Sequence, residues 1–157
     1  MADQPISVLE QRRIEAGVLK PLVRAFEAEL GRERAREILA EVIKGLAREK
    51  GAAMAKEAGG NSLGVYATLK EPWVRNGALE FTVLTEEEDA YDFNVTRCRY
   101  AEMYREMGLE DLGFYLSCNR DGTLIEGFNP GLELTRTQTI MQGAAFCDFR
   151  YRKRGNS

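Results

Sequence analysis

Apolar residues recur with the spacing of a helix through the first fifth of the chain. From residue 6 to residue 30 they follow one another at steps of three to five, which predicts a helix. Pro21 can begin a helix but cannot continue one at low cost, so we expect a kink or a break near Lys20. The members of this pattern are Ile6, Leu9, Ile14, Val18, Leu22 and Phe26.

A second helix is predicted from about Arg32 to Ala58. Its apolar residues form a stripe, with lysine, arginine and glutamate opposite, as in an amphipathic surface helix. The turn Gly59-Gly60-Asn61-Ser62 ends it, Ser62 is expected to cap a short helix over 63–70, and Pro72 stops that segment. The stripe comprises Ala35, Ile38, Leu39, Val42, Ile43 and Leu46.

The spacing changes to the alternation of β-strands after Asn76-Gly77. Residues 79–83 and 91–95 alternate apolar and polar side chains on either side of an acidic turn at 86–89. Alternation with a period of two, interrupted by a turn, predicts a β-hairpin.

Helical signals return after this hairpin. Thr96 stands where an N-cap would, before a helix predicted over 97–107 that Gly108 ends. Further helical turns are predicted over 112–118 and, with Asp121 as the cap, through Ile125.

Two strands close the chain, over 132–140 and 145–152, joined through Gln142-Gly143. This order predicts an α+β fold in which N-terminal helices pack on a four-stranded antiparallel sheet, made of two hairpins with a helical insert between them. The 157 residues suit one domain, 1–157, with a helical part at 6–58 and the sheet plus helical insert at 78–152.

The amino-acid composition excludes several kinds of catalytic and metal site. The chain has no histidine, which excludes Ser-His-Asp and Cys-His catalysis and any zinc site that needs imidazole. A net charge of −3 with mixed signs gives no reason to expect nucleic acid as a partner. No apolar run approaches the roughly 20 residues of a membrane span, and the start lacks the features of a signal sequence. We therefore expect a cytoplasmic protein that needs no cofactor.

Three widely spaced cysteines are the first candidates for reactivity, as free thiols. Cys98 lies where a strand gives way to a helix, and the helix dipole with Arg97 and Arg99 would favour its thiolate. Glu102 is four residues on and shares that helix face. The alternative is that Cys98 is a small buried apolar residue at the junction.

The other two cysteines differ in their surroundings. Cys118 has polar neighbours at a predicted helix end, which fits a cleft or an ordinary loop. Alternation places Cys147 with Phe149 and Tyr151 on the inner face of the last strand. Asp148 then lies on the opposite face, so it cannot easily act as the base for Cys147.

A threonine-rich strand supplies another candidate. Thr135, Thr137 and Thr139 share one face, which is a common β-strand pattern, whereas Arg136 on the other face could hold a carboxylate through two hydrogen bonds. Three cysteines and a carboxylate could bind zinc, but the chain has no Cys-x-x-Cys pair. We therefore predict no metal site.

Four blocks in the second half of the chain together resemble the L-2-amino-thiazoline-4-carboxylate hydrolase family. They are Phe93–Glu102, Glu126–Pro130, Thr135–Gly143 and Cys147–Tyr151, in the order found in that family. The resemblance is close over residues 79–152 and loose over the rest. It implies hydrolytic opening of a 2-aminothiazoline ring.

A fainter resemblance links the ending Gly143-x3-Cys147-x-Phe149 to 4-vinyl-reductase-type domains. Some of these domains are small-molecule sensors that hold zinc with cysteines and a glutamate, and they often dimerise through helices. Arg136 and Thr139 occupy two of the ligand positions here, and only Cys118 and Cys147 remain as counterparts. This resemblance implies a small-molecule-binding domain with a degraded zinc site.

Three functions are open, and a homodimer is compatible with all of them. The first is a hydrolase that opens a small heterocyclic amidine or thiazoline-type carboxylate ring at a C–N or C–S bond. Its candidate catalytic residues are Cys118, Cys98, Cys147, Glu102, Asp121 and Asp148, and its candidate substrate-binding residues are Asn94, Arg136, Thr139 and Asn129. The second is a sensor-like domain that binds a small molecule without catalysis, in a pocket between helices and sheet. A third possibility is an assembly protein that uses the stripe of the second helix as a dimer seam.

Overall fold

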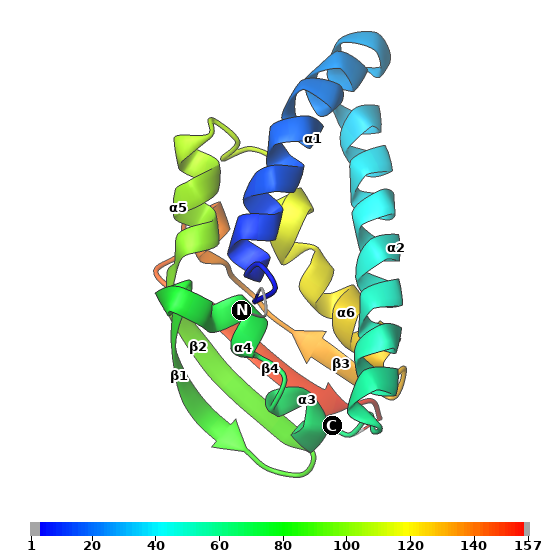
Figure 1. The fold of residues 1–157 in the computed structure, drawn as a ribbon, viewed down its shortest axis with the longest axis vertical. Coiled ribbons are helices and arrows are strands. Elements are labelled where there is room, and N and C mark those ends of the chain that lie inside the picture. Colours follow the sequence, from blue (N-terminus) through cyan, green and yellow to red (C-terminus); the bar gives the residue numbers. More distant parts are fainter. Residues whose placement is uncertain (1–3, 156–157) are drawn as a thin grey trace.

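The computed structural model describes residues 4–155 and has a helical layer on one face of an antiparallel sheet (Figure 1). The helices are α1 (Val8–Leu30), α2 (Arg32–Ala58), α3 (Leu63–Ala67), α4 (Glu71–Val74), α5 (Arg99–Glu106) and α6 (Arg120–Phe128). Shorter turns are the 3-10 helices η1 (Arg75–Gly77) and η3 (Ile140–Gln142) and the π-helical turn η2 (Phe114–Cys118). The ends of the predicted domain, residues 1–3 and 156–157, lie outside the described residues.

The sheet contains β1 (Leu79–Glu86), β2 (Ala90–Cys98), β3 (Leu132–Thr135) and β4 (Cys147–Lys153), in the order β1-β2-β4-β3. All neighbouring strands are antiparallel, and the two predicted hairpins meet where β2 pairs with β4. The predicted α+β arrangement is therefore confirmed, with α5, η2 and α6 as the helical insert.

Helix α1 runs through Pro21 without the break that its sequence suggested. Proline removes the hydrogen bond to the carbonyl four residues earlier, which here belongs to Gly17. Gly17 and Pro21 both lie on the exposed side of the helix, so water can satisfy that carbonyl. Ser7 caps the start of the helix by accepting a hydrogen bond from the Glu10 amide at 3.2 Å.

The buried face of α1 is not the one that its large apolar residues mark. Its fully buried positions are Val8, Arg12, Ala16 and Val23. Most of the predicted apolar pattern faces outward instead: the exposed fractions are 57% for Ile14, 67% for Val18, 45% for Leu22 and 39% for Phe26. An arginine thus occupies the inner side of this helix while an apolar stripe covers its outer side.

Helix α2 packs along α6 at very short range. A Cβ atom added to Gly51 would lie 2.1 Å from the carbonyl oxygen of Leu124, and one added to Gly127 would lie 2.1 Å from that of Arg48. The two helices therefore touch backbone to backbone, with space for hydrogen atoms only. This contact fixes the distance between α2 and α6.

The structure also corrects several element boundaries. The strand β2 continues through Thr96, and Cys98 is the N-cap of α5, its sulfur accepting from the Ala101 amide at 3.4 Å. The predicted strand 132–140 ends at Thr135, because the Thr137 and Gln138 amides donate to the Asp148 carboxylate instead of to a neighbouring strand. Asp121 lies inside the first turn of α6 rather than at its cap, and Pro72 sits in the first turn of α4.

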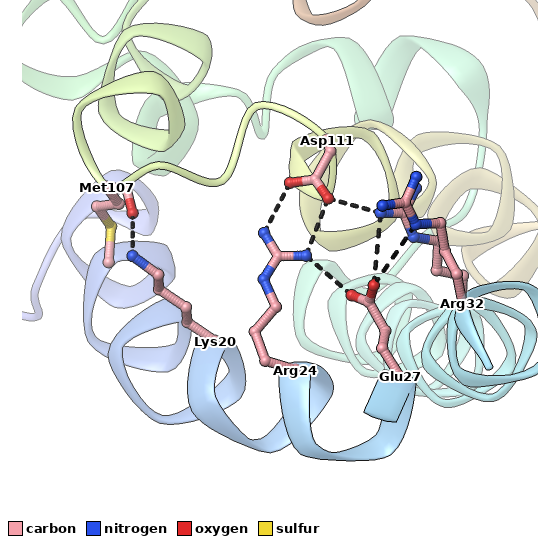
Figure 2. Close-up of polar contacts among 7 residues, drawn as sticks. Lys20, Arg24, Glu27, Arg32, Met107 and Asp111 are labelled. Carbon is pink, nitrogen blue, oxygen red and sulfur yellow. Dashed lines mark hydrogen bonds and ion pairs between the residues drawn. The ribbon is translucent and has the colours of Figure 1, made fainter. Parts of the chain in front are cut away.

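An ion-pair network connects the C-terminal end of α1 and the N-terminal end of α2 to the loop between α5 and η2 (Figure 2). Arg24 donates two hydrogen bonds of 2.9 Å to the two carboxylate oxygens of Asp111. Arg36 from α2 donates to the same carboxylate at 2.5 Å, and Glu27 lies between the two arginines. Hydrogen bonds from Arg24 lower the pKa of Asp111.

We expect Asp111→Asn to lower the stability of the fold by about 1 kcal/mol, because two arginines then face each other with less compensation. The melting temperature should fall by about 2–4 °C at neutral pH. Because the pKa of Asp111 is lowered, its contribution is present above the ordinary aspartate pKa and is lost as the pH falls through the lowered value. Calorimetry measures the melting temperature of this variant. Asp89→Asn, which removes an exposed ion pair with Lys153, is the matched control. Equal melting temperatures would contradict it.

Candidate functional site

A cavity of about 930 Å³ lies between the helical layer and the sheet. Its wall takes residues from α1, α2, the segment around α4, the strands β1, β2 and β4, and the first turn of α6. Its size falls at the upper end of the 300–1,000 Å³ typical of small-molecule sites. The side chains in its wall that can carry chemistry include Arg12, Glu15, Cys98, Ser117, Cys118, Arg120, Asp121, Arg136 and Cys147.

The π-helical turn η2 supplies much of the polar wall. It ends at Cys118, and α6 begins at Arg120, so Ser117, Cys118, Arg120 and Asp121 all reach the cavity from one short segment. Its wider backbone is held by the Asn119 amide, which donates to the Phe114 carbonyl at 2.7 Å. Turns of this kind are often found at functional sites, because they re-aim side chains within a helix.

Asp121 and Arg136 form a partly buried ion pair in the wall. The Arg136 guanidinium donates to Asp121 at 2.5 Å and to the Cys118 carbonyl at 2.9 Å, and it lies 5.0 Å from the centre of the Phe149 ring. Burial raises the pKa of Asp121, although the charge of Arg136 opposes the shift. Burial also lowers the pKa of Arg136, but the charge of Asp121 outweighs it and the net shift is upward.

A second charged group enters from α1. Arg12 donates to both oxygens of Glu15 at 3.1 and 3.2 Å, and Arg120 donates to the same carboxylate at 3.3 Å. Both arginine side chains are nearly buried, with exposed fractions of 10% and 12%. Burial, and then the charge of Arg12, lower the pKa of Arg120 to about 10. The two guanidinium groups therefore share one carboxylate and repel each other.

The three cysteines line this same cavity, and all are unpaired. Burial raises the pKa of the Cys98 thiol to about 11, and it also raises those of Cys118 and Cys147. The Cys147 sulfur lies on the inner face, as predicted, and accepts from the Ile140 amide at 3.2 Å. The expectation that Cys98 is a stabilised thiolate is wrong, because desolvation outweighs the hydrogen bonds from the helix start.

The structure thus brings together five of the ten predicted site residues: Cys98, Cys118, Cys147, Asp121 and Arg136. Glu102 lies on the surface, where it pairs with Arg97 at 3.0 Å. Asp148 accepts hydrogen bonds from the Thr137 and Gln138 amides, and so it holds the segment after β3.

The remaining three predicted residues support turns and strands outside the cavity wall. Asn94 accepts from Arg150 at 2.9 Å across the pair β2–β4. Thr139 is buried and caps η3 by accepting from the Gln142 amide. Asn129 donates to the Asn61 carbonyl at 2.9 Å and accepts from the Gly131 amide at 2.8 Å, which fixes the end of α6.

Sequence reasoning missed Arg12, Glu15 and Arg120. A signal for Arg12 was present, because it stands four residues after Val8 and four before Ala16, on the inner row of α1. The larger apolar residues of α1 predict a different inner face, one that does not include Arg12. Arg120 carries no comparable sequence signal, because its direction depends on the π-helical turn before it.

Two further properties bear on the class of site. Within residues 4–155, no three cysteine, aspartate or glutamate side chains are grouped as they would be around a metal ion. No helix in the described part of the chain has the length and apolar content needed to cross a membrane.

An antiparallel sheet and a helical layer that enclose a cavity with ion pairs and thiols define an α+β domain, and the cavity is large enough for a small molecule. The chain belongs to the L-2-amino-thiazoline-4-carboxylic acid hydrolase family, whose family model matches residues 11–151. This confirms the resemblance carried by the four sequence blocks. No curated protein matches the chain.

Among solved structures, the fold is similar to one described as the crystal structure of the phenol-responsive sensory domain of the transcription activator PoxR with phenol. The TM-score is 0.56 at 13% identity, and the match covers 87% of this chain and 73% of that chain. At this identity the likeness shows a shared fold.

The raised thiol pKa values predict slow alkylation. At pH 8 we expect Cys98 to react with iodoacetamide about 100-fold or more slowly than free cysteine, because so little of it is thiolate. Its rate should keep rising between pH 8 and 10, beyond the point where a free thiol levels off. Mass spectrometry of labelled peptides measures this, with circular dichroism to confirm that the fold persists. A plateau near pH 8.5 would contradict the shift.

Proposed function

We propose that this protein hydrolyses a C–N or C–S bond in a small cyclic amidine or thiazoline-type ring that carries a carboxylate. One observation carries the proposal, namely the charge of the polar wall. Three arginines, Arg12, Arg120 and Arg136, share two carboxylates, Glu15 and Asp121. This cluster has one positive charge in excess, and a substrate carboxylate would neutralise it. Membership of the family supports the same reaction class.

Arg12 and Arg120 are the proposed binding site for that carboxylate. Guanidinium groups present paired N–H donors that match a carboxylate, and burial strengthens such contacts. The lowered pKa of Arg120 reflects burial and repulsion from Arg12, and an anion between them would relieve the repulsion. The ring of the substrate would then lie near Asp121 and the thiols, which line the same cavity.

Asp121 is the proposed base. A carboxylate with a raised pKa is a stronger proton acceptor than an ordinary aspartate, and Arg136 holds it in place. Asp121 would take a proton from water while the water oxygen adds to the amidine carbon between two heteroatoms. Breaking the C–N or C–S bond would then return that proton to the departing nitrogen or sulfur. Attack by Cys118 or Cys98 is the competing route, and the neutral state of both thiols favours water.

Replacing Asp121 with Asn should lower kcat for L-2-amino-thiazoline-4-carboxylate by about 100-fold or more, the range for loss of a general base. In the wild type, kcat/KM should fall as the pH drops through a pKa above that of ordinary aspartate, since the base must be ionised. Chromatography with mass detection of the ring-opened product measures both.

Single Cys→Ser changes at positions 98, 118 and 147 separate the two routes, with Asp89→Asn as a surface control. We expect each serine variant to keep most of its activity. If Cys118→Ser alone abolished turnover while Asp121→Asn did not, water activation would be wrong and thiol attack correct.

A non-catalytic, sensor-like domain is the second candidate function. It is favoured by a second hollow of about 90 Å³ beside the cavity, lined largely by aromatic side chains, and by the fold likeness to a sensory domain. Saturable binding of a carboxylate ligand with no ring-opened product would support this candidate over the hydrolase.

We also propose that the protein works in the cytoplasm. Its three cysteines are all unpaired, which suits a reducing compartment.

The outer face of α1 supports a homodimer. Ile14, Val18, Leu22 and Phe26 expose an apolar stripe, and Val42 on the adjoining helix α2 is also 56% exposed. Contiguous exposed apolar side chains of this kind mark an interaction surface. A second copy can present the same stripe across a two-fold axis, so the surface complements itself.

Light scattering after size exclusion should give a mass of about 35 kDa, twice the 17.7 kDa of one chain. Val18→Glu should shift the protein to a monomer, because it places a charge at the centre of the stripe. Leu84→Glu is the matched control, since Leu84 on β1 is 53% exposed but lies on another element, and it should remain dimeric. A wild-type monomer at micromolar concentration would refute the dimer.

A further inference from the structure

The cavity continues into an aromatic compartment that ring hydrolysis alone does not explain. We call it the aromatic annex and define it by Tyr66, Lys70, Trp73, Phe93 and Phe149, which lie in its wall. Seven residues border both the annex and the main cavity, namely Met54, Leu69, Trp73, Leu79, Asp121, Leu124 and Phe149. The two compartments are therefore adjacent and share part of their walls.

Rings from the sheet form the floor of the annex. Phe93 and Phe149 are partners in the pair β2–β4, and their rings stack with centroids 4.7 Å apart and planes within 12°. Phe81 extends the row, with its ring centre 5.7 Å from that of Phe93. Phe81, Phe93 and Phe149 are only partly buried, and all three lie in the wall of the annex.

The opposite wall comes from the segment that holds α3 and α4. Trp73 borders both compartments, and the Lys70 ammonium lies 5.4 Å from the Phe81 ring centre and 5.7 Å from that of Tyr91. Lys70 also donates to the Tyr91 hydroxyl at 3.3 Å. Trp73 and the aromatic side chains of the sheet thus line the same hollow.

The Arg12–Glu15–Arg120 cluster and the sheet rings line different parts of the two compartments, although the Lys70 ammonium also lies in the annex wall. Arg12, Glu15 and Arg120 border the main cavity and are absent from the annex wall, whereas Phe93 borders the annex alone. Asp121 stands where the two compartments join. A single five-membered ring with a carboxylate would fill only a small part of a volume near 930 Å³. The arrangement suits a longer ligand with an anionic end and an aromatic end.

We propose that the natural ligand is a carboxylate whose heterocycle carries an aromatic substituent, which lies in the annex against Phe149. The anionic end of this ligand rests on the proposed function, because it uses the Arg12–Arg120 site. The aromatic end is an independent feature, since it depends on the sheet and on Trp73. Phe149 is then a specificity-determining residue rather than a catalytic one.

Titration calorimetry with propionate and 3-phenylpropionate tests the annex without requiring turnover. The phenyl compound should bind about 10- to 100-fold more tightly to the wild type, as expected for burying one ring. Phe149→Ala should reduce this advantage to about threefold or less. Leu69→Trp should do the same by filling the annex, whereas the matched control Leu69→Ala should keep it. Circular dichroism checks the fold of each variant.

Equal affinities for the two compounds, no binding of either, or an advantage that survives in both Phe149→Ala and Leu69→Trp would overturn the annex proposal. Turnover of unsubstituted L-2-amino-thiazoline-4-carboxylate separates this failure from failure of the proposed function. Turnover without a phenyl advantage would leave the hydrolase standing and remove the annex. A phenyl advantage without turnover would keep the annex and remove the hydrolase.

Discussion

The guanidinium of Arg136 joins three parts of the chain at the wall of the cavity. It binds the Asp121 carboxylate at the start of α6, the Cys118 carbonyl at the end of the π-helical turn, and the face of the Phe149 ring on β4. Each partner satisfies a different property of the group: its charge, its N–H donors and its flat apolar face. Without Arg136, Asp121 would be an isolated charge in a poorly solvated place, which is costly. The helical insert and the end of the sheet are held together by this contact.

Other charged residues in the cavity wall are also held in ion pairs. Buried charges are tolerated when they are paired, and Glu15 pairs with both Arg12 and Arg120. The pairing is incomplete, because two guanidinium groups share one carboxylate. An excess of one positive charge in a partly closed space attracts anions, which is the basis of the proposed carboxylate site. Structural stability alone would be better served by apolar side chains at these positions.

The fold could be read from the sequence because its signals are local. The period of apolar residues separates helices from strands, and the turns at 59–62 and 86–89 mark where elements end. The site was predictable only in part. Alternation along β4 placed Cys147 inward, and residue type singled out Arg136 and Asp121. Arg12 was missed because the larger apolar residues of α1 lie on the exposed side of that helix. The spacing of apolar residues alone does not tell which side of a helix is buried. The surface position of Glu102 follows from a helix that begins two residues later than expected.

The contact of α2 with α6 has a consequence for the dimensions of the cavity. Two missing methyl groups, at Gly51 and Gly127, let the helix axes approach until their backbones meet. The position of α6 sets where Asp121 stands, and α2 contributes Lys50 and Met54 to the wall of the same cavity. The spacing of these two helices along the cavity is therefore set by contact between their backbones, which thermal motion of side chains cannot change. A larger residue at Gly51 or Gly127 would push α6 away from α2, and Asp121 would shift with α6.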